Sequence, residues 1–327
     1  LYTGDTKVIN DNSDAIFRYL KYLCGIRNRE GIILSGLGDW CQSARKRVDI
    51  PKAPSYFTST LIACDSADKA AKLFAAIGAT EYQKFAESLR DALHSSARKK
   101  FIRSDCKTVT ARCQTAQAMA IYYGLFEPAE RPAAFSVLLD LINENDGSFD
   151  CGVLGMRVLF HVLSEFGQTE LALKMITKPD FPSYGYWFEN GATSLWELMT
   201  PITGTQSSCN HHFFGDVAAW FLKSLSGIKL NPYGDDPDRV LIEPKFVSDP
   251  DHVTASLNAR SGKIRVEWKR NGGHIFGDIV IPDGVHAELL LPEGWQTSDG
   301  FTIKQIKGTC HFDIIRSDEP DEYKFSV

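Results

Sequence analysis

The sequence lacks any run of apolar residues long enough to cross a membrane. Its longest mostly apolar stretches, such as residues 133–139, are far shorter than the about 20 residues that a spanning helix needs. It also lacks long basic runs, because the largest block is Arg98-Lys99-Lys100 and the net charge is −5. We therefore expect neither a membrane nor a nucleic acid as a partner.

Paired cysteines are lacking as well. No two cysteines form a CxxC pair, which argues against a zinc ribbon and against a thioredoxin-type redox site. We expect buried free thiols, with disulfides as the alternative. The cysteines are Cys24, Cys41, Cys64, Cys106, Cys113, Cys151, Cys209 and Cys310.

Several common catalytic motifs are also missing. There is no GxxxxGK[ST] loop, no GxGxxG after a strand, no HExxH and no GxSxG. The acidic stretches Asp235-Asp236-Pro237 and Asp249-Pro250-Asp251 have no EF-hand spacing around them, so we interpret them as turns. We expect no cofactor and no bound metal.

Helical periodicity is the main pattern of residues 1–226. Apolar residues recur three or four positions apart, which predicts about nine helices joined mostly by short polar loops. This pattern is typical of an array of antiparallel helix hairpins. The clearest stripes are Ile16/Leu20/Leu23, Tyr82/Phe85/Leu89/Leu93 and Leu154/Val158/Val162/Phe166.

The pattern changes after Gly227. Short β-branched or alternating segments follow one another, as where Ile264, Val266 and Trp268 alternate with charged residues. Residues 271–273 (Asn-Gly-Gly) and 282–284 (Pro-Asp-Gly) predict two tight turns, and we interpret both as hairpin turns. The fold class is therefore mainly α plus β, with a helical domain at 1–226 and an antiparallel β-sandwich at 227–327.

Two long segments of the helical part, residues 31–56 and 178–190, are rich in glycine, proline and aromatics, so we expect them to build a site. Aromatic rings stack on sugar C–H faces and carboxylates bind hydroxyls, which favours a neutral, ring-shaped ligand. In residues 182–197, we expect a helix to open at 191–193 with Glu197 near its start beside Trp196. Burial against the indole raises a carboxyl pKa and suits acid/base work. The alternative is a core tryptophan and a solvated acid.

Two weaker motifs contain the other candidates. Gly36-Leu37-Gly38 precedes Asp39 and Trp40, and glycines let the backbone come close to a ligand. The alternative there is an ordinary Asx turn. Residues 210–216 contain His211 and His212, which cannot both face one side of a helix. We expect one histidine to reach a ligand while its neighbour packs.

These motifs together resemble the catalytic module of the bacterial α-L-rhamnosidases, inverting glycoside hydrolases with a six-hairpin α/α barrel. The resemblance rests on residues 2–5 (Tyr-Thr-Gly-Asp), 38–40 (Gly-Asp-Trp), 191–197 (Gly-Ala-Thr-Ser-Leu-Trp-Glu) and 210–215 (Asn-His, then Phe-Gly). The tail after Gly227 resembles the family's C-terminal β-sandwich. The resemblance implies a partial (α/α)6 toroid, because nine helices are fewer than twelve.

The resemblance also implies roles. Glu197 matches the general base that activates water. Trp40, with Asp39 beside it, matches a wall of the rhamnose site, and His211 matches a partner of a sugar hydroxyl. The implied ligand is a rhamnose-containing glycoside or oligosaccharide. The aromatic residues implied around the same pocket are Tyr184, Trp187 and Trp196.

One part of the family pattern is missing. The family's general acid lies in an Arg-Asp-Glu stretch just before its Thr-Gly-Asp segment, which here is Thr3-Gly4-Asp5. We therefore expect the acid, and the first helices of the barrel, upstream of Leu1 in the same polypeptide. Two alternatives stay open. The chain can be a non-catalytic carbohydrate-binding fragment, or part of another α/α-barrel glycosidase, phosphorylase or lyase.

Overall fold

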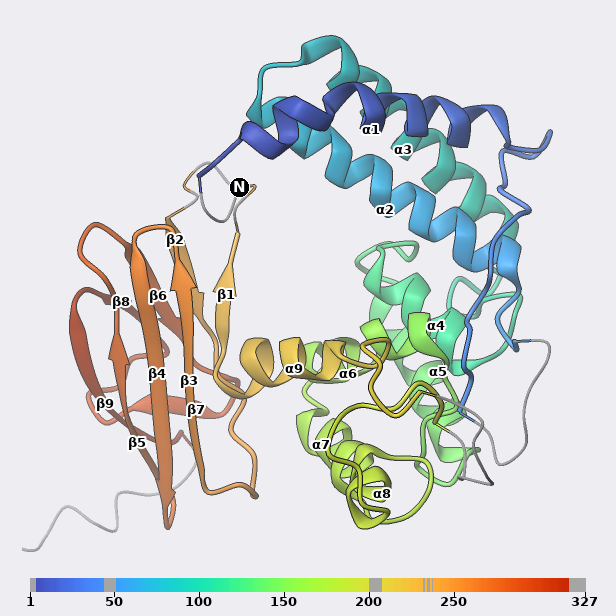
Figure 1. Ribbon diagram of the computed structural model, residues 1–327. Coiled ribbons are helices and arrows are strands. Elements are labelled where there is room, and N and C mark those ends of the chain that lie inside the picture. Colours follow the sequence, from blue (N-terminus) through green and yellow to red (C-terminus); the bar gives the residue numbers. More distant parts are fainter. Residues whose placement is uncertain are drawn as a thin grey trace, which may run out of the picture. The chain divides into compact units, whose positions relative to one another are not determined.

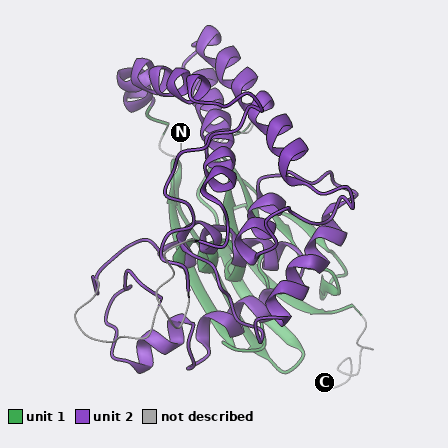
Figure 2. Cartoon of the chain, turned by 90° about the vertical axis from the view of Figure 1, so that its right-hand side faces the viewer, with its two compact units in different colours: residues 1–5, 218–327 green, residues 6–217 purple. Residues whose placement is uncertain are grey.

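The computed structural model describes residues 4–43, 51–199, 208–231, 233, 236 and 238–317. The chain divides into two compact units, residues 6–217 in one and residues 1–5 with 218–327 in the other (Figure 2). The domain boundary that we expect at residues 226–227 falls inside the second unit and stays a prediction. Tyr2, Thr3, Asp235 and Pro237, which belong to motifs discussed above, lie outside the described residues.

The first unit consists of helices, most of them in hairpins. Hairpins α2/α3 and α6/α7 have three-residue connections, in which Gly78 and Gly167 adopt positive φ angles of 69° and 76° that a side chain disfavours (Figure 1). The boundary between the units falls within α9, so the short π-helical turn that follows it, η1 (Phe221–Leu225), belongs to the second unit. The helices are α1 (Lys7–Gly25), α2 (Ser55–Ala76), α3 (Thr80–Phe101), α4 (Gln114–Tyr122), α5 (Arg131–Asn143), α6 (Val153–Glu165), α7 (Thr169–Thr177), α8 (Tyr184–Glu189) and α9 (Asp216–Trp220).

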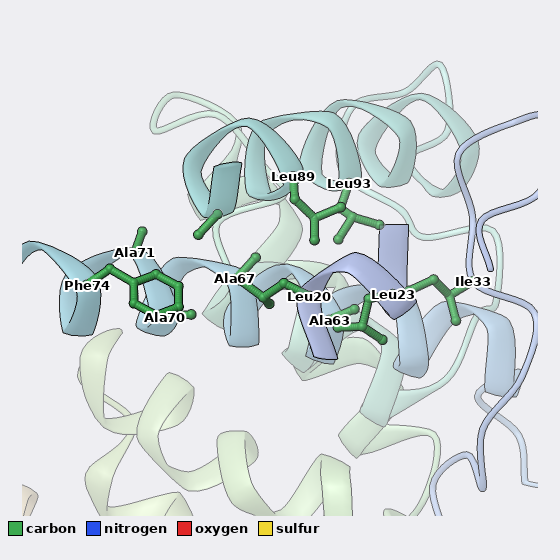
Figure 3. Packing of buried hydrophobic residues seen from close by; sticks show 11 residues of the cluster. Leu20, Leu23, Ile33, Ala63, Ala67, Ala70, Ala71, Phe74, Leu89 and Leu93 are labelled. Carbon is green, nitrogen blue, oxygen red and sulfur yellow. The ribbon is translucent and has the colours of Figure 1, made fainter. Parts of the chain in front are cut away.

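A hydrophobic cluster joins α1, α2 and α3 (Figure 3). Leu20 and Leu23 of α1 and Leu89 and Leu93 of α3 are at most 5% exposed, which confirms the stripes predicted for these helices. Between them, α2 contributes a row of small residues, and their size lets both neighbouring helices approach closely. This row consists of Ala63, Ala67, Ala70 and Ala71. Each fully buried leucine contributes about 1.5–3 kcal/mol.

An ion pair ties α3 to the residue that precedes α5. The Arg98 guanidinium donates to both carboxylate oxygens of Glu130, at 2.9 and 2.8 Å, and to the carbonyl of Leu125 at 2.6 Å. This bidentate hydrogen bond lowers the pKa of Glu130 from 4.5 to about 2. The ionised pair therefore stabilises the fold fully above pH 4.5, and the stabilisation is lost as the pH falls from 4.5 toward 2.

We predict that Glu130→Gln lowers the urea midpoint of unfolding at pH 7, and that the difference from the parent chain shrinks as the pH falls below 4.5. Glu127→Gln is the matched control, because Glu127 lies 3.6 Å from the same guanidinium and its side chain is 61% exposed. The control should change the midpoint little. A difference that stays constant between pH 7 and pH 4 would contradict the prediction.

The second unit contains two β-sheets. The four-stranded sheet has the order β1-β2-β6-β8 and the five-stranded sheet the order β3-β4-β5-β9-β7. Strands β2 and β6 pair in parallel, whereas the other described pairs are antiparallel. The strands are β1 (Ile228–Leu230), β2 (Arg239–Ile242), β3 (His252–Ala259), β4 (Gly262–Asn271), β5 (His274–Val280), β6 (His286–Leu290), β7 (Trp295–Thr297), β8 (Ile303–Ile306) and β9 (Thr309–Arg316).

Strand β4 shows how the alternating pattern orients a strand. Ile264, Val266 and Trp268 are 0% exposed, as their spacing predicts, and the Trp268 indole N–H donates to the carbonyl of Leu225 at 2.8 Å. Asn271 pairs with His274, which confirms the hairpin turn between β4 and β5.

The second predicted hairpin turn, residues 282–284, is not a hairpin. It connects β5 of one sheet to β6 of the other. The residue types of a turn reverse the chain, but they do not decide which strand the chain then pairs with. The interpretation as a hairpin was therefore wrong.

The eight cysteines are all free thiols, but only Cys113 and Cys151 are fully buried, so the expectation of buried thiols is correct only for these two. In the part of the chain that the structure describes, no helix is both long enough and apolar enough to span a bilayer. The same residues contain no group of three or more His, Cys, Asp or Glu side chains that could hold a metal ion.

Candidate functional site

The loop of residues 38–43 lies against the beginning of α6. The carbonyl of Trp40 accepts a hydrogen bond from the Val153 amide at 2.8 Å, and the Ser43 amide donates to the carbonyl of Cys151 at 2.9 Å. The Gln42 side chain donates to the carbonyl of Asp150 at 3.0 Å. These bonds hold the loop in place while the Trp40 side chain remains 45% exposed.

Asp39 points inward from this loop and is 1% exposed. Its carboxylate accepts hydrogen bonds from the amides of Gly152 (2.7 Å), Leu154 (2.9 Å) and Gly155 (3.0 Å), and from the Thr115 hydroxyl. Burial raises the pKa of Asp39 above its ordinary value, and these four hydrogen bonds oppose the rise. The resemblance implies that Asp39 lies beside the sugar. In the structure, its carboxylate binds three backbone amides and the Thr115 hydroxyl inside the protein.

The segment that contains Glu197 is not helical, so the helix expected at residues 191–193 was wrong. The helix lies earlier, at α8, and Gly191 with φ of 83° follows its end. Residues 194–197 instead run beside residues 208–211. The His211 amide donates to the Leu195 carbonyl at 2.8 Å, and the Glu197 amide donates to the Ser208 carbonyl at 2.9 Å.

Glu197 is half-buried in this arrangement. One carboxylate oxygen, Oε2, accepts a hydrogen bond from the Ser208 amide at 3.2 Å. The backbone bond and the side-chain bond to the same residue fix the direction in which the carboxylate points. In the described part of the chain, no donor contacts its other oxygen, which can therefore accept a proton.

The predicted aromatic residues Tyr184, Trp187 and Trp196 are buried, at 5%, 2% and 6% exposure. Their rings pack together with Phe214, and the Tyr184 hydroxyl donates to the carbonyl of Phe214 at 2.8 Å. The expectation that they surround the rhamnose site stays a prediction. The three side chains form a core that supports the two segments carrying Glu197 and His211.

His211 is half-buried and His212 is exposed. The Nδ1 atom of His211 accepts a hydrogen bond from the Phe213 amide at 3.2 Å, so the neutral ring carries its proton on Nε2. The ring also packs edge-on against Phe213, with 3.8 Å between ring centroids. His211 therefore has a fixed orientation and one N–H donor for a ligand.

Two observations link these segments. A largely apolar cavity of about 540 Å³ is lined by both Trp40 and Phe213, and Phe213 packs on His211. The backbone bonds between residues 194–197 and 208–211 place Glu197 beside the segment that contains His211 and Phe213. Trp40, Glu197 and His211 thus lie in one region. The other candidates are buried, and they are Asp39, Tyr184, Trp187 and Trp196.

Several residues of this region are absent from the sequence-based prediction. Phe213 borders the cavity, as do Tyr19 and Tyr22 of α1, and Thr115 holds Asp39. Phe213 directly follows His212 in the motif of residues 210–216, so its position in the sequence could have indicated that it belongs to the site. Thr115 is 76 residues from Asp39 in the chain, so no local pattern links the two.

Trp40 differs from every other tryptophan of the chain in its exposure. It is 45% exposed, whereas Trp187, Trp196 and Trp295 are at most 7% exposed and Trp220 and Trp268 are fully buried. We predict that Trp40→Phe removes most of the tryptophan fluorescence that acrylamide quenches. Trp295→Phe is the control and should leave the quenchable fraction nearly unchanged. Equal loss in both variants would contradict the exposure of Trp40.

The architecture and the site are those of a helix-hairpin protein with a carbohydrate-binding type of site. Helix hairpins precede a two-sheet β unit, and the helical unit contains a carboxylate, an exposed indole and an oriented histidine together. The model of the bacterial alpha-L-rhamnosidase 6 hairpin glycosidase domain matches residues 1–225, and that of the bacterial alpha-L-rhamnosidase C-terminal domain matches residues 230–301. The chain belongs to this family.

Curated relatives agree. An alpha-L-rhamnosidase of Formosa agariphila is 26% identical over 307 residues, which cover 89% of this chain and 32% of the relative. One from Streptomyces avermitilis is 27% identical over 326 residues, covering 95% of this chain and 30% of the relative. The chain therefore spans about a third of the length of these relatives.

A solved structure shows the same fold. The alpha-L-rhamnosidase from Dictyoglumus thermophilum is 25% identical and superimposes with a TM-score of 0.85, over 96% of this chain and 38% of the other. The expected helix-hairpin fold with a C-terminal β region is thus confirmed.

Proposed function

We propose that this chain is part of an α-L-rhamnosidase that hydrolyses terminal α-L-rhamnosides with inversion, with Glu197 as general base. The observation that carries the proposal is the grouping of Glu197, Trp40 and His211 in a chain that belongs to the rhamnosidase family. Residues 1–226 would then form part of the catalytic domain, and residues 227–327 an accessory β domain.

Each residue has a role that follows from its contacts. The Ser208 amide holds Oε2 of Glu197, and the second oxygen takes a proton from water as that water attacks the anomeric carbon. The exposed indole of Trp40 packs on the apolar face of the sugar. His211, whose Nδ1 already accepts a hydrogen bond, donates from Nε2 to a sugar hydroxyl.

The proposed reaction also needs a general acid. In an inverting glycosidase the acid and the base are roughly 6.5–9.5 Å apart, with the sugar and the attacking water between them. The order of the motifs leads us to propose that this acid lies upstream of Leu1. Residues 1–327 by themselves would then bind the sugar without turning it over.

The proposal is tested on two forms of the protein. Residues 1–327 should bind L-rhamnose in a saturable manner, detected as protection of Trp40 from acrylamide. The longer polypeptide should release β-L-rhamnose first from an aryl α-L-rhamnoside, detected by proton NMR. Initial release of α-L-rhamnose would contradict inversion.

We predict that Glu197→Gln in the longer polypeptide lowers kcat by about 10²- to 10⁴-fold, because the amide cannot take the proton of the attacking water. Glu189→Gln is the matched control, since Glu189 is an exposed acid at the end of α8. The control should retain the parent activity. Near-full activity of a folded Glu197→Gln variant would overturn the assignment.

The two alternatives give different results in the same assays. If the chain is a non-catalytic carbohydrate-binding fragment, residues 1–327 would bind L-rhamnose, and neither they nor the longer polypeptide would hydrolyse a rhamnoside. Another α/α-barrel glycosidase, phosphorylase or lyase would act on other members of an aryl-glycoside panel, such as uronides, and not on rhamnosides.

A further inference from the structure

We propose that Asp39 and Thr115 are positioning residues, which hold Trp40 in place by capping α6, and that Asp39 is not a sugar ligand. This inference rests on the proposed function only where it concerns sugar binding. The capping itself follows from contacts within the helical unit.

The first backbone N–H groups of a helix have no partner inside that helix. At the start of α6 these groups belong to Gly152, Val153, Leu154 and Gly155. All four donate to two consecutive residues of the loop, three to the Asp39 carboxylate and the fourth, from Val153, to the Trp40 carbonyl. The first bond within the helix runs from the Met156 amide to the Gly152 carbonyl at 3.0 Å. The cap of α6 is thus complete, and it comes from 113 residues away.

Two glycines make this close approach possible. A Cβ atom on Gly152 would lie 2.3 Å from the carbonyl oxygens of both Asp39 and Trp40. A Cβ atom on Gly155 would lie 2.4 Å from the Thr115 hydroxyl oxygen. The atoms beside Gly152 belong to the backbone and cannot move aside, so this cap requires that position 152 lacks a side chain, whereas the atom nearest to Gly155 is the end of the Thr115 side chain.

The hydrogen bonds to Asp39 leave it no capacity for a sugar hydroxyl. An ionised carboxylate has about four acceptor positions, and three amides and the Thr115 hydroxyl supply four donors. The side chain is also 1% exposed. Its effect on a ligand must therefore pass through Trp40, whose main chain is bonded to the same helix end.

Thr115 offers the cleanest test, because its hydroxyl can be removed without changing its shape. It is 3% exposed and does not line the cavity. Thr115→Val removes one of the four donors to the carboxylate, and Thr115→Ser keeps the hydroxyl. Thr177→Val is the control for the general cost of this substitution, because the Thr177 hydroxyl bonds only within α7, to the carbonyl of Leu173 at 2.9 Å.

The first measurement needs no sugar. In residues 1–327, Thr115→Val should change the acrylamide quenching of Trp40, whereas Thr115→Ser and Thr177→Val should leave it as in the parent chain. Unchanged quenching in Thr115→Val, together with a lowered Tm, would show a merely structural role and overturn the proposal. If Thr115→Val does not fold, Asp39→Asn is used in its place. The asparagine side chain has the shape of aspartate, but its NH2 group would face the Gly152 N–H, so that hydrogen bond is lost.

The second measurement is L-rhamnose affinity. Because Thr115 acts on the sugar only through the position of Trp40, Thr115→Val should weaken binding by only about 3- to 10-fold, and Thr115→Ser should restore it. Parent-like affinity in Thr115→Val would overturn the positioning role. If the parent chain itself binds no L-rhamnose, the proposed function fails, while the quenching comparison still decides the capping.

Discussion

The carboxylate of Asp39, buried at the beginning of α6, is the contact on which the geometry of the candidate site depends. A helix N-terminus presents unpaired N–H groups and a partial positive charge, so it stabilises a negative side chain that would otherwise be costly to bury. Because the next residue is Trp40, the same contact sets the position of the exposed indole. A second pairing, between residues 194–197 and 208–211, orients Glu197 and His211 in a comparable way.

Much of the fold could be predicted from the sequence, because the elements are periodic. The stripe Leu89/Leu93 and the alternation around Val266 are local patterns, and each was confirmed by the burial of those side chains. The parallel pairing of β2 with β6 could not be predicted, since 43 residues separate Ile242 from His286 and no local feature records the pairing. Strand β3 is also hard to predict, because its alternate residues are only partly buried and its two faces differ little in burial.

The sequence predicted which residues form the candidate site better than it predicted how their side chains are arranged. Motif resemblance selected Trp40, Glu197 and His211, and these three gather in one region. It could not distinguish exposed side chains such as Trp40 from buried ones such as Asp39 and Trp187. Whether a residue is buried depends on partners such as Thr115 that are distant in sequence.

The length of chain between Asp39 and α6 has a consequence for the order of folding. Closing a loop of 113 residues costs conformational entropy before its contacts repay it, whereas the hairpins within that loop, such as α2/α3, form from neighbouring segments. The hairpins can therefore nucleate early, and the cap of α6 can form only once they have brought residues 39 and 152 together. The candidate site is thus among the last parts of the helical unit to assemble.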